Sequence, residues 1–167
     1  MTVSDTIILD NLQVEQKIRR IAFQIYESNS NEEEIIIAGI ANNGYLFAEK
    51  VANVLATIST LKIELCKVII DKKNPIKSVS TSLNVNDYKN KSLVLIDDVL
   101  NSGTTLIYAV KHFLDVPLKR FKTAVLVNRN HKKYPVKADF KGISLSTSIK
   151  EHVVVEFNND KTFVYLT

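Results

Sequence analysis

The sequence predicts an α/β domain with a mainly parallel, twisted sheet flanked by helices and a β-hairpin near its carboxyl end. Short apolar runs alternate with segments of helical periodicity, in the order strand–helix–strand, loop, strand–helix–strand. Later, the alternating runs Val153–Phe157 and Thr162–Leu166 flank the turn-forming residues Asn158–Lys161, which indicates the hairpin. A parallel sheet of this kind binds ligands at the carboxyl ends of its strands.

The first half of the chain alternates between helical and strand-like patterns. The spacing of apolar residues over 14–25 places them on one face of a helix. The apolar run Ile35–Ile40 predicts a buried strand, a second helix is expected over 47–55, and Leu61–Ile70 predicts the next strand. Cys66 lies in this last run and is expected to be a small core residue.

The second half begins with a polar stretch. Residues 71–91 contain several Lys, Asn and Ser residues, which predicts a mobile loop or a short hairpin. The apolar run Ser92–Ile96 predicts a strand buried on both faces, and a helix is expected through Ile107 and Leu114. A further strand is predicted over Thr123–Asn128.

Length and composition favour one domain over residues 1–167. With 46% hydrophobic residues, this chain can bury a core without disulfides or a structural metal. No apolar stretch is long enough to span a membrane, and no secretory signal is visible at Met1–Asp10, so a cytoplasmic protein is expected. The net charge of +4 suits a small polyanionic ligand and would also tolerate RNA.

The most informative segment follows the strand over 92–96. Asp97 and Asp98 come where that strand is expected to end. A turn of small, hydroxyl-rich residues then opens the next helix: Asn101, Ser102, Gly103, Thr104 and Thr105. Backbone N–H groups at a helix start bind phosphate, and Gly103 is expected to remove a side chain that would block its approach. The carboxylates suit hydroxyl groups or a hydrated cation, so the pattern predicts a phosphorylated ribose with Mg²⁺.

Other readings of this segment are weaker. The glycine spacing matches neither a P-loop nor a dinucleotide-binding fingerprint. An ordinary strand–turn–helix unit with a polar cap at Thr104 or Thr105 is the alternative.

A second anion site is predicted where the strand over 35–40 meets the following helix. The residues there are Gly39, Ile40, Ala41, Asn42, Asn43 and Gly44. Two glycines bracketing two asparagines allow unusual backbone angles, and exposed N–H groups could hold an anion. The alternative is ordinary turn chemistry, for which Asn-Asn-Gly is equally suited.

The segment Asp97–Thr105 closely resembles the signature of the type I phosphoribosyltransferases, which bind 5-phosphoribosyl-1-pyrophosphate. Residues Ala124–Gly142, Ile8–Asp10 and Ile18–Ala22 are similar to the bifunctional pyrimidine-operon regulator and uracil phosphoribosyltransferase family. This resemblance implies a small hood over the base, formed by residues 129–150 with the N-terminal segment. It also implies a homodimer or a higher assembly.

The resemblance assigns roles to the candidate residues. Ser102 to Thr105 would hold the 5-phosphate, while Asp97 and Asp98 would bind the ribose hydroxyls and, as metal ligands, Mg²⁺. Residues 41–44 correspond to the pyrophosphate loop, although relatives often carry Lys or Arg there. The mobile loop would close over the site. The base would be bordered by Asn128 and Arg129.

Two departures bear on activity and on the base. Where the resembled family has an arginine at the start of its mobile loop, this chain has Lys72 and Lys73, which could replace it in catalysis. Where 6-oxopurine enzymes have an aspartate, this chain has Asn101, whose amide does not titrate, so uracil is favoured.

The alternative function is an RNA-binding attenuator of pyrimidine genes that senses nucleotides. It would use a basic face formed by Lys17, Arg19, Arg20, Lys132, Lys133, Lys137 and Lys141.

Overall fold

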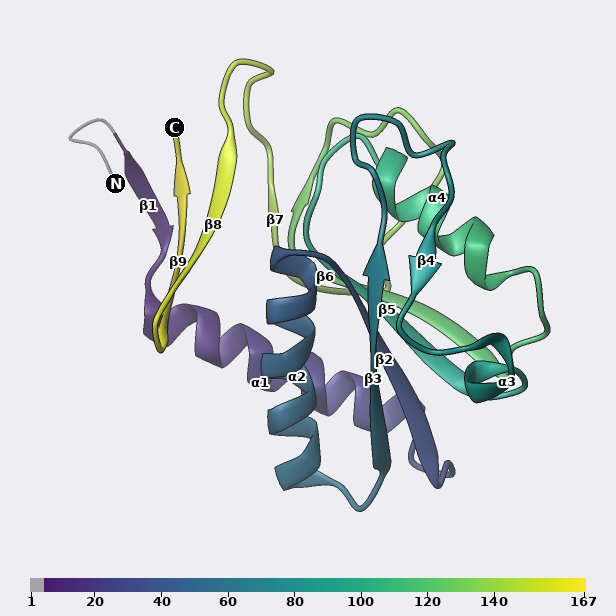
Figure 1. Ribbon diagram of the computed structural model, residues 1–167. Helices are drawn as coiled ribbons and strands as arrows, with labels where there is room; N and C mark the ends of the chain where they lie inside the picture. The colour runs from purple at the N-terminus through teal and green to yellow at the C-terminus, as the bar shows by residue number, and fades with distance from the viewer. Residues whose placement is uncertain (1–4) are drawn as a thin grey trace.

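The computed structural model describes residues 5–167 and contains a six-stranded main sheet beside a three-stranded antiparallel sheet (Figure 1). The main sheet has the order β4-β3-β2-β5-β6-β7, and all its strands except β4 are parallel. Its strands are β2 (Glu34–Ile40), β3 (Lys62–Ile69), β4 (Ser80–Thr81), β5 (Ser92–Leu100), β6 (Arg120–Arg129) and β7 (Phe140–Leu145). The α/β class and the mainly parallel sheet predicted from the sequence are confirmed.

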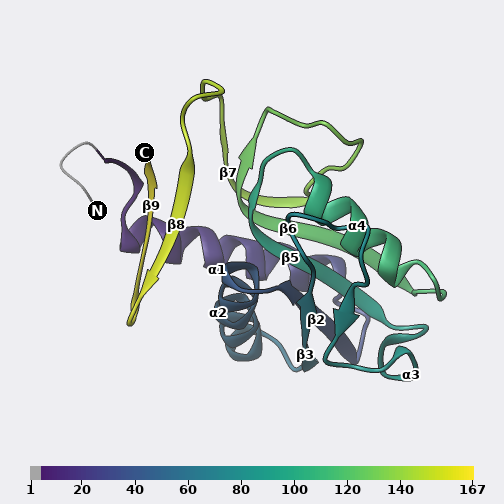
Figure 2. The same cartoon turned by 45° about the horizontal axis from the view of Figure 1, so that its top comes forward.

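Helices cover both faces of the main sheet, because its central strands are apolar on both faces. α1 (Asn11–Ser28) and α2 (Asn43–Ile58) pack against one face, while α4 (Thr104–Phe113) and the short α3 (Val85–Tyr88) lie on the other (Figure 2). Side chains of β2 alternate accordingly, with Ile37 in the first core and Ile36 in the second. Among the described residues, no helix is both long and apolar enough to cross a membrane.

The small sheet joins the two ends of the chain. It contains β1 (Thr6–Leu9), β9 (Lys161–Leu166) and β8 (Val153–Asn158), in that order. Asn159 has φ 50° in the turn between β8 and β9, a conformation that Asn tolerates. The predicted C-terminal hairpin is therefore confirmed. Figures 1 and 2 show this sheet beside the main sheet, near the start of α1.

One predicted boundary was wrong. β5 does not end at Ile96 but continues through both carboxylates to Leu100, paired with β6. Of the two alternatives for residues 71–91, the structure favours the hairpin, since β4 pairs antiparallel with β3, and α3 follows β4. The aromatic ring of Tyr88 is buried and packs edge-on against Phe113, which fixes α3 against the second core.

One further strand of the main sheet, β7, was not predicted from the sequence. Residues 140–145, expected in the hood, form β7 and pair in parallel with β6. Gly142 permits this close pairing, because a Cβ there would lie 2.5 Å from the carbonyl oxygen of Leu126. Of the predicted hood, the loops at 130–139 and 146–152 and the small sheet lie outside the main sheet.

Candidate active site

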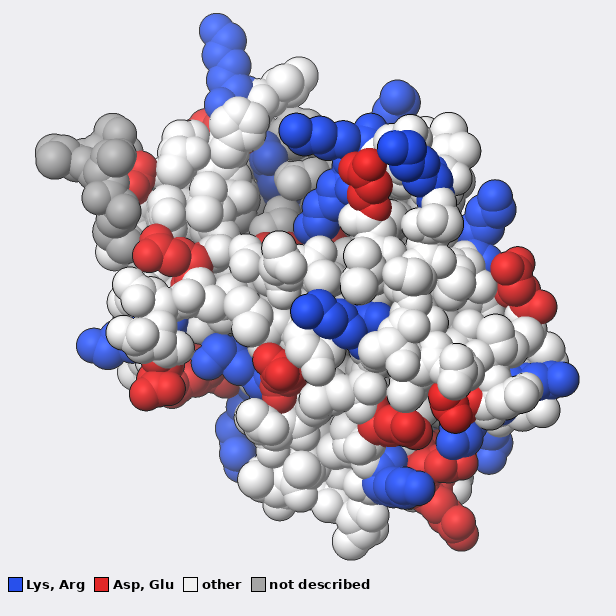
Figure 3. Space-filling view, viewed as in Figure 1, with Lys and Arg blue, Asp and Glu red and all other residues white. Residues whose placement is uncertain are grey.

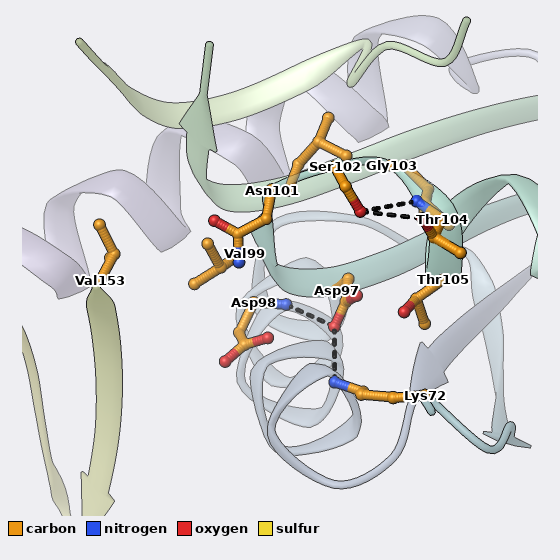
Figure 4. A pocket seen from close by; sticks show the side chains of 12 residues that line it. Lys72, Asp97, Asp98, Val99, Asn101, Ser102, Gly103, Thr104, Thr105 and Val153 are labelled. Carbon is orange, nitrogen blue, oxygen red and sulfur yellow. Dashed lines mark hydrogen bonds and ion pairs between the residues drawn. The ribbon is translucent and has the colours of Figure 1, made fainter. Parts of the chain in front are cut away.

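The predicted site is a cavity of about 300 Å³ at the carboxyl end of β5, where this strand leads into α4 (Figure 4). One continuous segment, residues 97–106, forms most of its wall. Two further residues come from elsewhere, Lys72 from the loop after β3 and Val153 from β8. Neighbouring residues of a strand point in opposite directions, yet both carboxylates border this cavity.

Two sets of hydrogen bonds fix the turn before α4, one within the turn and one from the loop at 130–139. Within it, the hydroxyl oxygens of Ser102 and Thr104 lie 2.9 Å apart, and the Thr104 N–H donates to Ser102 Oγ at 3.3 Å. From outside, the N–H groups of Lys133 and Tyr134 donate to the Ser102 carbonyl oxygen at 2.8 and 3.1 Å. The first N–H groups of a helix have no partner within the helix, so this turn presents donors and a positive dipole end to the cavity.

Gly103 has a different role from the one the sequence suggested. Its φ of 83° is in the left-handed region, and a Cβ there would lie 2.5 Å from Cγ1 of Val136. The added atom would meet the loop behind the turn, so we correct the expectation that this glycine clears the phosphate path. Gly103 is required by its backbone angle and by the close packing of the 130–139 loop.

The other two candidate glycines are also required by close packing. Of the four glycines, all within the described residues, Gly103 is the one with positive φ, so the expected unusual angles at Gly39 and Gly44 are not observed. A Cβ on Gly39 would lie 2.5 Å from the Cα of Tyr45. A Cβ on Gly44 would lie 2.8 Å from Oδ1 of Asp97. Gly44 therefore lets α2 begin directly against the acidic pair.

The two carboxylates are buried and have different partners. Asp97 and Asp98 are 4% and 8% exposed. Oδ1 of Asp97 accepts the Asp98 N–H at 3.0 Å and lies 4.0 Å from Nζ of Lys72. Oδ2 of Asp98 accepts Nδ2 of Asn43 at 3.2 Å. The same Asn43 nitrogen donates to the Val155 carbonyl oxygen at 3.0 Å, which connects the acidic pair to the small sheet.

Burial raises the pKa of Asp97 well above its ordinary value of 3.8. The neighbouring charge of Asp98 raises this pKa further, and the Lys72 ammonium partly offsets both effects. Because the ionised form of Asp97 is unfavourable in the folded protein, a cation bound beside this carboxylate would stabilise it.

This raised pKa predicts a pH-dependent stability. The folded state binds the Asp97 proton more tightly than the unfolded state, so stability falls as pH rises from about 3.8 through the folded pKa. Asp97→Asn should therefore raise the melting temperature at pH 7 by a few degrees, since ~1 kcal/mol corresponds to roughly 2–4 °C in a domain of this size. The gain should vanish near pH 3.5. Thermal unfolding with a chelator present, using the exposed Asp115→Asn as control, measures this; a gain independent of pH contradicts it.

The two candidate lysines differ. The ammonium of Lys72 borders the cavity and faces Asp97, as Figure 4 shows. Lys73 does not border this cavity. The carboxylate of Asp71 accepts the N–H groups of Lys73 and Asn74 at 3.0 and 3.2 Å, which closes a tight turn after β3. Of the pair, Lys72 is therefore the residue placed to act on a ligand.

The predicted pyrophosphate loop, residues 41–44, lies behind the cavity and does not border it. Its Ala41–Asn42 peptide bond is cis, and α2 begins at Asn43. The Ala41 N–H donates to the Val68 carbonyl oxygen at 2.8 Å, and the Asn42 carbonyl oxygen accepts the Leu46 N–H at 3.2 Å. Asn43, through its bond to Asp98, is the member of this loop that reaches the site.

Asn128 and Arg129, expected to border the base, are both buried and do not border the cavity. Asn128 Nδ2 donates to Ser144 Oγ at 3.2 Å, which joins β6 to β7. Arg129 instead reaches the site through Asn101, whose side-chain oxygen accepts its Nη1 at 3.0 Å. The apolar wall formed by Val99 and Val153 was not predicted, because apolar residues in strands carry no chemical signature.

Comparisons with known proteins show the family to which the chain belongs. Residues 4–160 match the family model of the phosphoribosyl transferase domain. The bifunctional protein PyrR of Macrococcus caseolyticus is 30% identical over 169 residues, which cover 96% of this chain and 97% of the relative. The protein of the same name from a Geobacter species is 32% identical over 164 residues, 93% of each chain.

Solved structures show the same fold at lower identity. The hypoxanthine phosphoribosyltransferase of Trypanosoma cruzi matches with a TM-score of 0.77 and 12% identity, covering 95% of both chains. A hypoxanthine-guanine phosphoribosyltransferase from Bacillus anthracis matches with a TM-score of 0.74 and 18% identity, covering 89% of this chain and 86% of that one. At these identities the likeness shows a shared fold and carries no information on the base.

Proposed function

The chain belongs to the phosphoribosyl transferase domain family, and from that premise we propose that it transfers the phosphoribosyl group of 5-phosphoribosyl-1-pyrophosphate to uracil. The products would be uridine 5′-monophosphate and pyrophosphate. One observation carries the proposal. A single cavity joins the hydroxyl-rich start of α4 to two buried carboxylates, and this is the pairing that a phosphorylated ribose requires.

The cavity has two chemically different ends (Figure 4). The turn over 102–105 supplies donors at one end, Val99 and Val153 supply an apolar wall at the other, and Lys72 supplies positive charge next to Asp97. We place the 5-phosphate at the turn, the ribose over the carboxylates and the base against the apolar wall. This order follows the covalent order of the ligand, in which the ribose separates phosphate from base.

The donor set of the acidic pair fits a substrate-bound Mg²⁺. Mg²⁺ prefers oxygen ligands, keeps several waters and is commonly held by one or two carboxylates together with substrate phosphates. Asp97 and Asp98 supply such carboxylates, and no group of three or more acidic, His or Cys ligands occurs among the described residues. When bound, the ion would neutralise negative charge on the departing pyrophosphate. The other contributions to the reaction come from side chains of this chain.

The transfer needs no nucleophilic side chain. An oxocarbenium-like ribose is stabilised by nearby negative charge, which the buried carboxylates provide. The apolar wall and β8 limit the access of water to that cation. Lys72 is the single Lys or Arg among the described residues that border the cavity, so it is the side chain available to the leaving pyrophosphate.

Pyrophosphate release from 5-phosphoribosyl-1-pyrophosphate, measured with uracil, cytosine, hypoxanthine and guanine, tests this function. We expect release with uracil, at a rate below that of ordinary uracil phosphoribosyltransferases, because the basic side chain at the described cavity is Lys72, which cannot hold pyrophosphate in the bidentate way of an arginine. Release with the purines alone would overturn the pyrimidine assignment. Ligand binding without release for any base would overturn the enzymatic proposal.

Removing the Asp98 carboxylate should weaken binding of the Mg²⁺-loaded ligand. A hydrogen bond to a charged group contributes ~1.5–3 kcal/mol, so Asp98→Ala should raise the dissociation constant by roughly 10- to 150-fold. Asp97→Ala should act in the same direction, because both carboxylates border the cavity. Titration calorimetry measures both, with the exposed Asp115→Ala as control. Wild-type affinity in both single variants would show that neither carboxylate contacts the ligand.

A second candidate function is RNA binding, favoured by four exposed lysines: Lys132, Lys133, Lys137 and Lys141. The backbone N–H of Lys133 donates to the Ser102 carbonyl oxygen, so this part of the group lies next to the phosphate turn. The face drawn in Figure 3 has basic and acidic side chains interspersed, with several basic ones near its upper edge. Arg20 is also exposed and lies beside Lys141, because its Nη2 donates to the carbonyl oxygens of Lys141 and Gly142 at 2.8 and 2.6 Å. An RNA affinity that falls steeply with salt, and falls again when the four lysines are changed to Ala, would support this function.

A further inference from the structure

The side chain of Asn101 is oriented by Arg129, whose guanidinium can donate hydrogen bonds but cannot accept them. Its side-chain oxygen accepts Nη1 of Arg129 at 3.0 Å. A guanidinium has no acceptor, so the amide oxygen must face it and the amide NH₂ must face away. Figure 4 shows that nitrogen on the side toward Asp98, and none of the described residues accepts a hydrogen bond from it. The exposed Asn101 therefore presents a donor to the cavity.

Further hydrogen bonds hold the Arg129 guanidinium in place, so the side-chain amide of Asn101 cannot flip by displacing it. Arg129 is 6% exposed. Its Nε and Nη2 donate to Oγ1 of Thr147 at 3.0 and 2.7 Å, and Nη2 also donates to the carbonyl oxygens of Ser148 and Glu151 at 3.2 and 2.8 Å. A reversed amide would point NH₂ at the buried guanidinium and leave two donors facing each other.

This donor lies at the end of the cavity that we assign to the base. Asn101 borders the cavity together with Val99 and Val153, whereas the phosphate turn begins one residue later in the chain. A flat ring held against the two valines would direct an edge, and not a face, to the amide.

We propose that Asn101 makes the site select nucleobases with a carbonyl oxygen over those with an amino group at the same ring position, and that Arg129 is the positioning residue that enforces this choice. The inference rests on the proposed function and specifies its substrate class. Uracil and cytosine form the matched pair, because they carry an oxygen and an NH₂ respectively at C4. An NH₂ opposite the Asn101 amide would set two donors against each other.

Three ligands separate this inference from the proposed function: uridine 5′-monophosphate, cytidine 5′-monophosphate and ribose 5-phosphate. Calorimetry on the folded wild type should show the uridine nucleotide binding ~10-fold or more tightly than the cytidine nucleotide, because unpaired polar groups discriminate strongly. Asn101→Ala should bring the ratio close to one. Asn101→Asp presents an acceptor and should reverse the preference. The affinity for ribose 5-phosphate, which lacks a base, is measured in each variant as the reference, and any effect of the substitution on the phosphate end cancels in the uridine-to-cytidine ratio.

Arg129 is tested through the same ratio. Arg129→Lys keeps the charge but loses the planar fork that bonds Asn101 and Thr147 in fixed directions, so the uridine preference should fall while ribose 5-phosphate still binds. If that variant fails to fold, Thr147→Val removes an acceptor of the guanidinium and Thr147→Ser retains it, and only the valine variant should lose preference. An unchanged ratio in Asn101→Ala and Asn101→Asp overturns this inference alone. Absence of ribose 5-phosphate binding in the wild type overturns the proposed function and this inference with it.

Discussion

Gly103→Val should abolish measurable binding of 5-phosphoribosyl-1-pyrophosphate while the domain still folds. The φ of 83° at this position costs a β-branched residue ~1–3 kcal/mol. Overpacking costs another ~1–3 kcal/mol, because the new Cβ would lie 2.5 Å from Cγ1 of Val136. The turn can escape both costs by moving, and this would displace the N–H groups that we assign to the phosphate. We expect the affinity to fall on the order of 100-fold or more.

Two further variants separate the causes of this loss. Gly103→Ala has the same backbone cost with one added atom, so its loss should be smaller. Combining it with Val136→Ala removes the close contact and should recover part of the binding. Calorimetry with circular dichroism as a check on folding measures these effects. Unchanged affinity in folded Gly103→Val would exclude this turn as the phosphate site.

Lys72→Ala should lower kcat by about 10- to 100-fold and change KM much less. Negative charge grows on the leaving pyrophosphate in the transition state, so a cation that acts there affects rate more than ground-state binding. Removing a fixed, desolvated donor typically costs 10²–10³ in rate. The Lys72 side chain is 49% exposed, so solvent screening places our expectation below that range.

Lys73→Ala is the matched control, because this neighbouring lysine does not border the cavity. Lys72→Arg should retain most of the rate, since the charge stays in place. Steady-state kinetics with uracil distinguishes these results. Equal rates for the wild type, Lys72→Ala and Lys73→Ala would show that the loop after β3 takes no part in the reaction.

The elements that the sequence predicted are those with a local signature. α1 has a periodic apolar face and an Asp10–Gln13 capping box, and β2 has a continuous buried run. β4 and β7 have no such pattern, since β4 has only two residues and the short β7 contains Lys141, Gly142 and Ser144 among its apolar residues, so both acquire their structure by pairing. β5 was predicted too short, because aspartate is unfavourable in strands, yet pairing with β6 carries the strand past both carboxylates.

The site was predictable to the extent that it is contiguous in sequence. Residues 97–105 follow one another, so their chemistry could be read directly. The choice between Lys72 and Lys73 depends on the turn capped by Asp71, which composition does not reveal. Arg129 was expected to border the base, but it does not border the cavity and instead bonds Asn101, because its hydrogen-bond partners come from segments distant in sequence.

The claim that the β5–α4 cavity holds a phosphorylated ribose is tested most directly by amide chemical shifts. Ribose 5-phosphate should be titrated into ¹⁵N-labelled protein with Mg²⁺, and again into Gly103→Val. We predict saturable shifts concentrated at residues 97–106 and at Lys72 in the wild type, and their loss in the variant. Shifts confined to another surface, such as the hairpin turn at 158–163, or no shifts at saturating ligand, would contradict the account.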